Sequence, residues 1–250
     1  MPAGSTTGGQ RRLGGTMRED AWWLELVPAV ALLGAFGIYA TLRAFEGTYY
    51  EWGPYLSPFY SPLIDSHHRW WPFSPALLIL IWPLGFRVTC YYYRKAYYRA
   101  FWRAPAACAV REPHASYSGE TRFPLILQNL HRYFFYVVIL ISVLNTYDMV
   151  QAFRGPNGSF GFGLGSLIML VNVVLLWAYT LSCHSCRHIT GGRLKNFSKH
   201  PARYWAWTQV SKLNARHMQL AWTTLGTLML TDLYILLVAS GTISDLRFFN

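Results

Sequence analysis

Two thiols and two imidazoles fall within six residues in the segment TLSCHSCRHITGG, which closes a long apolar run. Cys183, His184, Cys186 and His188 are side chains that bind soft and borderline metals well. Zinc accepts such a set at a closed tetrahedral site. A Rieske-type [2Fe–2S] centre holds one iron by two thiolates and the other by two imidazoles. Haem b would leave both thiols unused, and a reducing compartment disfavours a disulfide. The residue types therefore favour zinc or a Rieske-type cluster.

Helix geometry limits how these four side chains could share one centre. At about 100° per residue, Cys183 and Cys186 lie about 60° apart, and His184 and His188 about 40° apart. The two pairs then face roughly opposite ways. All four can bind one centre only if the helix ends near Cys186, which the following ITGG would permit. Otherwise His131, His217 or Cys90 must supply the missing ligands.

The composition indicates an integral membrane protein. Of 250 residues, 53% are hydrophobic and only 13% are charged, against about 25% charged in soluble domains. The first twenty residues lack the apolar core of a signal peptide, so we expect residues 1–21 to form a disordered cytoplasmic tail. The rest, 22–250, is predicted to be an all-α anchor domain, a five-helix transmembrane bundle. The predicted spans are residues 22–44, 75–98, 127–150, 163–184 and 215–240.

The distribution of Lys and Arg predicts the orientation of the bundle. The net charge of +11 comes mostly from the N-terminal tail, the loop after the second span and the loop after the fourth. The positive-inside rule then places the N-terminus inside and the C-terminus outside. Because the charges follow the membrane topology, an acidic protein partner is a second explanation for them, and nucleic acid is not expected.

This topology brings the candidate ligands to one membrane level. The cluster at 183–188, His131, His217 and Cys90 all fall at the inner end of the bundle. The outer half offers only His67 and His68, in an aromatic loop at 45–74 that we expect along the outer interface. Arg87 within a span is either functional or snorkels to the interface, and Asp232 either pairs with a polar group or marks a proton path.

The segment CHSCRHITGGRLKNFSKHPARYWAWTQVSKLNARHM resembles a known family. With its loop GGRLKNFSKHP and the helix entry SKLNARH, the chain from about residue 20 onward resembles the membrane-anchor (C) subunit of actinobacterial, mycobacterial-type succinate dehydrogenase. The resemblance implies a subunit of respiratory complex II in the bacterial plasma membrane. Its partners would be a flavoprotein that oxidises succinate and an iron–sulfur subunit, and its electron acceptor a quinone, menaquinone or ubiquinone.

The resemblance also bears on the cofactor. Related five-helix anchors carry two haems b, but this sequence has no His in the outer halves of its first and third helices, where an outer haem would need one. The class that it resembles most is associated with a Rieske-type [2Fe–2S] cluster in the membrane subunit. We therefore expect electron relay through the inner Cys/His centre to quinone. The alternatives are a haem b anchor and a non-redox scaffold with a structural zinc site.

Two further sets of residues are assigned roles at this stage. Arg132, His131, His217 and Arg87 are predicted to bind the quinone or deliver its protons. In the loop between the fourth and fifth spans, aromatic residues exceed what orientation requires, and aromatics are enriched at interface hot spots. The predicted docking surface for the iron–sulfur partner is Tyr204, Trp205 and Trp207.

Overall fold

The computed structural model describes residues 15–64, 72–113, 119–155 and 158–249, and it is mainly helical. Most of the predicted tail, together with His67 and His68, lies outside the described residues. Four helical stretches there are long and apolar enough to span a membrane, namely Trp22–Glu46, Leu125–Gln151, Leu164–Leu181 and His217–Ala239. They match four of the predicted spans to within a few residues. A bent pair of helices would make the fifth span.

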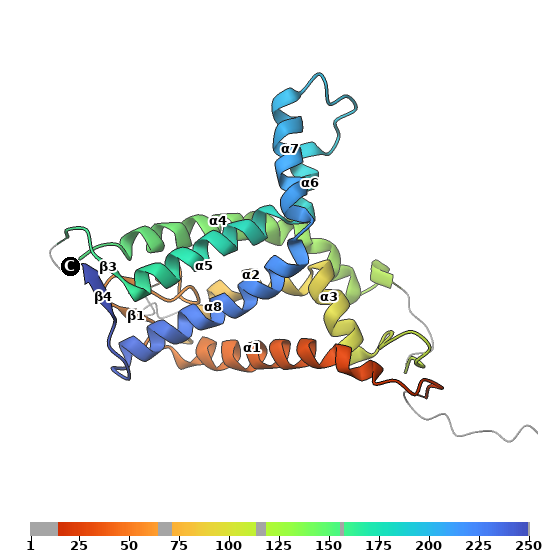
Figure 1. Cartoon of the computed structure of the whole chain (residues 1–250), viewed down its shortest axis with the longest axis horizontal. Helices are drawn as coiled ribbons and strands as arrows, with labels where there is room; N and C mark the ends of the chain where they lie inside the picture. The colour runs from red at the N-terminus through yellow and green to blue at the C-terminus, as the bar shows by residue number, and fades with distance from the viewer. Residues whose placement is uncertain (1–14, 65–71, 114–118, 156–157, 250) are drawn as a thin grey trace, which may run out of the picture.

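The long helices run alongside one another (Figure 1). They are α1 (Val27–Glu46, after the 3-10 turn η1, Trp22–Leu26), α4 (His131–Gln151, after η4, Leu125–Leu130), α5 (Leu164–Leu181) and α8 (His217–Ala239). α5 packs on both α4 and α8, and α2 (Ala76–Val88) packs on α4. α1 lies at the side of the bundle, and little of it is buried.

The second predicted span, 75–98, is wrong as a continuous helix. α2 ends at Val88, and the next segment turns by 80° into α3 (Tyr91–Tyr97) and the π-helical turn η2 (Tyr98–Trp102). The Thr89 hydroxyl donates back to the carbonyl of Gly85 at 2.7 Å, and Cys90 takes an extended backbone (φ −68°, ψ 132°). Cys90 therefore lies at the break, as the N-cap residue of α3.

The fourth span ends in a similar way. α5 stops at Leu181, three residues before the predicted end, and Cys183 has an extended backbone (φ −63°, ψ 144°) as the N-cap of α6 (His184–Gly191). α6 pairs with α7 (Pro201–Asn214) to form a hairpin that stands away from the bundle at a steep angle (Figure 1). We call the end of the bundle that carries Cys90 and Cys183 the cysteine end.

The opposite end is closed by the segment after α1 and by the C-terminal residues. Short antiparallel pairs form here: β1 (Glu51–Trp52) with β2 (Tyr55–Leu56), and β3 (Phe162–Gly163) with β4 (Arg247–Phe249). Tyr55, Phe59 and Tyr60 are fully buried. These three rings of the 45–74 loop thus fill space between helices at the bundle end, whereas Tyr49 and Phe73 of the same loop are exposed.

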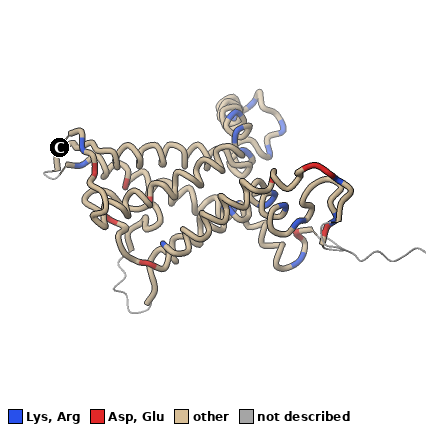
Figure 2. The backbone as a smooth tube through the Cα atoms, turned by 60° about the horizontal axis from the view of Figure 1, so that its bottom comes forward, with Lys and Arg blue, Asp and Glu red and all other residues tan. Residues whose placement is uncertain are grey.

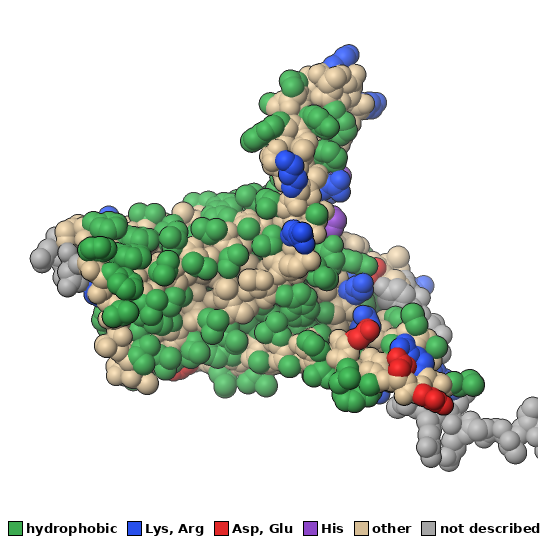
Figure 3. Space-filling model, in the orientation of Figure 1, with side chains coloured by type: hydrophobic (Ala, Val, Ile, Leu, Met, Phe, Trp, Pro, Cys, Tyr) green, Lys and Arg blue, Asp and Glu red, His purple; other side chains and the backbone are tan. Residues whose placement is uncertain are grey.

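Charge and hydrophobicity are distributed unevenly along the molecule. Lys and Arg gather near the cysteine end and on the α6–α7 hairpin (Figure 2). Hydrophobic side chains cover much of the bundle surface between the two ends (Figure 3). Near the start of the described chain, Thr16 pairs with Val110 and Arg18 donates to the carbonyl of Cys108 at 3.0 Å, so residues 15–21 lie against the loop before η3 (Gly119–Thr121).

Candidate metal centre

The breaks after α2 and α5 bring two cysteines to one cavity at the cysteine end. Cys90 and Cys183 are 2% and 1% exposed, and both line a cavity of about 450 Å³. We call it the cysteine cavity; its other lining residues include Thr89, His131, His184 and His217. Of the residues predicted as ligands, the cavity collects Cys90, Cys183, His131, His184 and His217.

Each cysteine faces one imidazole. The Nε2 atom of His131 lies 3.1 Å from the sulfur of Cys183, and Nε2 of His217 lies 3.7 Å from the sulfur of Cys90. His131 begins α4 and His217 begins α8, so four helices contribute to the two pairs. Thiols and imidazoles therefore meet as two Cys–His pairs on the wall of one cavity.

A hydroxyl orients each imidazole from behind. Nδ1 of His131 lies 2.9 Å from the Thr89 hydroxyl, and Nδ1 of His217 lies 2.6 Å from the Ser182 hydroxyl. Each hydroxyl already donates its own proton to a backbone carbonyl, Thr89 to Gly85 and Ser182 to Tyr179, both at 2.7 Å. It can then only accept from the imidazole, so Nδ1 carries the proton. The lone pair of Nε2 is left facing the sulfur, as a metal ligand requires.

The arrangement is crossed. Thr89 precedes Cys90 but orients the histidine that faces Cys183, and Ser182 precedes Cys183 but orients the histidine that faces Cys90. Sequence analysis did not single out Thr89 or Ser182. The available signal was a hydroxyl residue directly before a cysteine at both places, Thr-Cys and Ser-Cys.

Aromatic rings pack around the two histidines. Phe86 stacks on His131 with ring centroids 4.7 Å apart, and Tyr179 stacks on His217 at 5.2 Å. Tyr92 contacts both His217 and His184, with its ring centroid 5.5 Å and 6.4 Å from theirs. These contacts fix the ring planes and keep water from much of the pair surface, which preserves the ligand geometry.

The predicted four-residue cluster does not come together. Because α6 restarts at His184, Cys186 turns into the hydrophobic core and does not line the cysteine cavity. His188 is exposed, and its Nδ1 lies 3.0 Å from Nη2 of Arg132. Across the described ranges, no group of three or more Cys, His, Asp or Glu side chains converges on one ion position. The donors form pairs around a cavity, in contrast to a closed tetrahedral set.

Burial also affects the cysteines beyond the end of α5. It raises the pKa of the Cys183 thiol to about 12 and raises that of Cys186 as well. Both side chains are then protonated at neutral pH. A metal bound at Cys183 would have to displace the proton, which couples metal binding to proton release.

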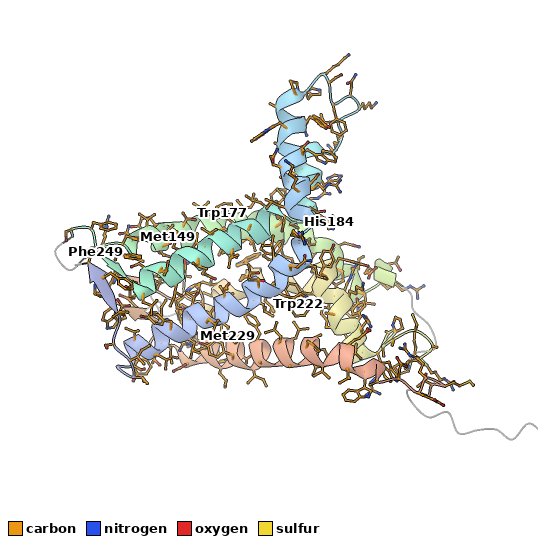
Figure 4. The ribbon with its side chains drawn as sticks, in the orientation of Figure 1. Met149, Trp177, His184, Trp222, Met229 and Phe249 are labelled. Carbon is orange, nitrogen blue, oxygen red and sulfur yellow. The ribbon has the colours of Figure 1, made fainter. Side chains whose placement is uncertain are left out.

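A second cavity adjoins the first at the base of the hairpin. It measures about 460 Å³ and is lined by Arg132, His184, Ser185, Arg187, His188, Gly191, Gly192 and Trp207. Three of these residues, Arg132, His184 and Ser185, also line the cysteine cavity. His184 lies where the hairpin meets the bundle (Figure 4). We call this the hairpin cavity; its lining contains basic side chains and no carboxylate.

The predicted docking residues divide into two groups. Trp205 is 67% and Tyr204 47% exposed on the hairpin. Trp207 instead packs inside the hairpin, where a Cβ atom on Gly191 would come within 2.1 Å of its ring and where the Arg187 guanidinium lies 5.0 Å from the ring centroid. Trp207 therefore holds α6 against α7. The docking role stays a prediction for all three residues, and Tyr204 and Trp205 are the two whose rings are exposed.

Arg87 and Asp232 both have defined surroundings. Arg87 is buried and lines neither the cysteine cavity nor the hairpin cavity. The geometry therefore gives no support to its predicted contact with quinone. Asp232 is fully buried and pairs with Arg43 at 2.7 Å. Asp232 was expected either to pair with a polar group or to mark a proton path, and the structure shows the first.

The fold and this site define a helical integral membrane protein with paired thiols and imidazoles at one end of its bundle. The family model of the actinobacterial succinate dehydrogenase subunit SdhC matches residues 24–241, and the chain belongs to that family. It is a membrane-anchor subunit of the succinate dehydrogenase complex, as the sequence resemblance had indicated. No curated protein matches the chain.

A solved structure agrees with this assignment. The chain is similar to a chain of the Mycobacterium smegmatis Sdh1 complex in the apo form, with 59% sequence identity and a TM-score of 0.86. The match covers 97% of this chain and 98% of the other. The similarity to a member of a complex implies that this chain, too, has succinate dehydrogenase subunits as partners.

Proposed function

We propose that this chain relays electrons from its partner subunits to a membrane quinone through a [2Fe–2S] centre. Its ligands would be Cys90, Cys183, His131 and His217. The observation that carries the proposal is the crossed arrangement of two Cys–His pairs, each with its Nε2 lone pair turned toward a sulfur, on the wall of one cavity.

The donor set fits a Rieske-type centre better than its rivals. Two thiols and two imidazoles are the ligands that such a centre takes. A structural zinc site would need its four ligands around one point, and the described residues offer no such convergence. A haem would not use the two thiols. When bound, the centre would carry one electron at a time, at a potential of about −150 to +300 mV, which suits transfer to a quinone.

The residues of the chain have distinct parts in this function. Cys90 and Cys183 would bind as thiolates, and Thr89 and Ser182 would keep the two imidazoles in the ligating tautomer. Quinone reduction takes up two electrons and two protons. Arg132 and His184 border both cavities. They are the groups best placed to hydrogen-bond a quinone head group in the hairpin cavity while it is close to the centre.

The proposal extends to topology and partners. We propose that the cysteine end faces the cytoplasm across the bacterial plasma membrane, with the N-terminus inside and the C-terminus outside. The basic side chains at that end, together with Tyr204 and Trp205, would dock the iron–sulfur subunit, which in turn connects to the flavoprotein. Succinate oxidation would then take place in the flavoprotein and quinone reduction in this chain, with menaquinone the preferred acceptor.

A spectrum of the purified complex tests the nature of the cofactor. We expect broad iron–sulfur absorption and an EPR signal with the low average g value of a Rieske-type centre. A sharp Soret band would favour the haem alternative. No centre assignable to this chain, with zinc found by metal analysis, would favour the scaffold.

Serine variants test the ligands. Cys90→Ser and Cys183→Ser should each abolish the Rieske-type signal and quinone reduction, while succinate oxidation with a soluble dye continues. Cys186→Ser is the matched control, because this thiol is buried nearby but does not line the cysteine cavity. If Cys186→Ser removes the signal and Cys90→Ser keeps it, the ligands are those of the 183–188 segment and our assignment is wrong.

A further inference from the structure

Arg87 is a buried cation without a buried anion. It is 7% exposed and lies in the last turn of α2, the first helix of the bent pair that would make the fifth span. No ion pair among the described residues includes it. Its hydrogen-bond partners in the described part of the chain are neutral, namely the hydroxyls of Tyr93 and Thr224 and the carbonyl of Ala221. A charge in this environment is costly unless something compensates for it.

The other buried arginine shows how this protein compensates a buried cation elsewhere. Arg43, 2% exposed, pairs with Asp232 at 2.7 Å and with Glu46 at 2.6 Å. Arg87 has no such carboxylate in the described part of the chain. The rings of Tyr93 and Tyr179, 5.5 Å and 4.9 Å from the guanidinium, offset part of its charge. A bound group that carries negative charge would compensate for the rest.

Arg87 lies close to the Cys90–His217 pair. Its guanidinium lies 4.9 Å from the centroid of the Tyr179 ring, and that ring stacks on His217 at 5.2 Å. The carbonyl of Arg87 accepts the backbone N–H of Cys90 at 3.1 Å, and Cys90 faces His217. The hydroxyl of Tyr179 is buried without a hydrogen-bond partner. These contacts link the unpaired cation directly to the Cys90–His217 pair.

We infer that Arg87 is a positioning residue whose positive charge stabilises the reduced state of the proposed [2Fe–2S] centre, of which Cys90 and His217 would be two ligands, and so raises its reduction potential. The inference rests on the proposed function. Binding of metal by Cys90 replaces a thiol with a thiolate, and the arrival of one electron adds one further negative charge. No proton is needed to balance that charge, because Arg87 is always protonated. In a low-dielectric interior this favours the reduced form.

The test is an EPR-monitored redox titration of the whole complex. Arg87→Gln should lower the midpoint of the Rieske-type signal, with a fall of at least tenfold in the reduction equilibrium constant, about 59 mV for one electron. Arg87→Lys keeps a charge at this position and should restore most of the potential. Lys212→Gln, which removes an exposed cation from the hairpin, should leave the midpoint unchanged.

A second variant covers the case in which Arg87→Gln fails to assemble. Thr224 lies 3.3 Å from Nη2 of Arg87. Thr224→Asp would give the guanidinium a carboxylate and should lower the midpoint in the same direction while Arg87 remains in place. Thr224→Asn is its neutral control and should change the midpoint little, since it adds no charge.

The outcomes separate this inference from the proposed function. A wild-type complex without a Rieske-type signal from this chain overturns both. A normal signal whose midpoint is unchanged in Thr224→Asp, and in Arg87→Gln where that variant assembles, overturns only the role of Arg87. Equal shifts in Thr224→Asp and Thr224→Asn would also overturn it, because packing and not charge would then set the potential.

Discussion

Individual buried polar residues determine what each end of this protein can do. At the cysteine end, two hydroxyls, two imidazoles and two thiols form crossed chains that end in metal-ligating atoms. At the opposite end, Asp232 accepts hydrogen bonds from Arg43, Tyr39 and Ser57. The first set would hold the centre that we propose, whereas the second is satisfied within the protein and serves stability.

The Asp232 network makes a prediction about stability. Asp232→Asn keeps the size of the side chain but removes the charge that faces the buried Arg43. We expect a loss on the order of 3 kcal/mol in the free energy of unfolding, because Arg43 keeps only the partly exposed Glu46 as a charged partner. Thermal inactivation of the detergent-solubilised complex measures it.

Asp20→Asn is the control for this prediction. Asp20 also pairs with an arginine, Arg18, but on an exposed part of the chain. Solvent screens that pair, so the inactivation temperature should not change. If Asp232→Asn and Asp20→Asn have the same inactivation temperature, the buried Arg43–Asp232 pair does not stabilise the protein more than an exposed pair does.

At the scale of elements, close helix packing depends on a few glycines. A Cβ atom on Gly165, in the first turn of α5, would lie 2.4 Å from the ring of the fully buried Tyr55. Tyr55 also donates to Asp245 at 2.7 Å, so it cannot move aside freely. Gly165→Ala should therefore destabilise the protein by about 1–3 kcal/mol, measured as earlier thermal inactivation.

Gly226 provides the matched substitution in another helix. It lies within α8, and a Cβ atom there would meet nothing within 4 Å. Gly226→Ala should keep or raise the stability, by up to about 1 kcal/mol, because alanine has the higher helix propensity. If both variants lose stability to the same extent, the contact with Tyr55 is not the cause.

The α6–α7 hairpin allows docking and folding roles to be separated. Trp205→Ala removes an exposed ring, so it should release the soluble subunits from membranes while the anchor stays stable. The expected cost is on the order of 2 kcal/mol of binding free energy, measured as lost membrane-bound succinate dehydrogenase activity. If the Trp205→Ala complex remains fully membrane-bound, this ring is not part of the docking surface.

Trp207→Ala should act differently. Trp207 fills the space beside Gly191 and lies under Arg187, so its loss leaves a cavity inside the hairpin. We expect α6 and α7 to separate, and the hairpin to become sensitive to protease even in the isolated anchor. Trp205→Ala should show no such sensitivity.

The whole molecule has one basic end, which makes the topology testable. Lys199 is exposed on the hairpin, and Thr242 is exposed beyond the end of α8. After replacement of the exposed Cys108, single cysteines at these two positions can be labelled in intact cells with an impermeant thiol reagent. We expect labelling at position 242 and none at position 199, because the basic end stays inside. Labelling at position 199 would reverse the orientation.

Much of this protein follows from its sequence alone. Apolar runs of span length determine the long helices, since backbone polar groups in hydrocarbon must be bonded within the helix. The motifs at 182–218 identified the family. The residue types Cys and His also predicted a metal centre with both sulfur and nitrogen ligands, and that centre stays a prediction. Each of these conclusions depends on local composition or spacing, which the chain carries along its length.

The Cys–His pairs and the partners of buried charges depend on the tertiary structure. The cluster at 183–188 drew attention because its members are close in sequence, yet the break at Cys183 separates them. Cys90 pairs with His217, and Cys183 with His131, across 127 and 52 positions of the chain. Thr89 and Cys90 stop a helix that the hydropathy extends through them. Such pairings arise from the packing of one helix against another. They could not be derived from the sequence, because the periodicity of a single helix does not encode which helix packs against it.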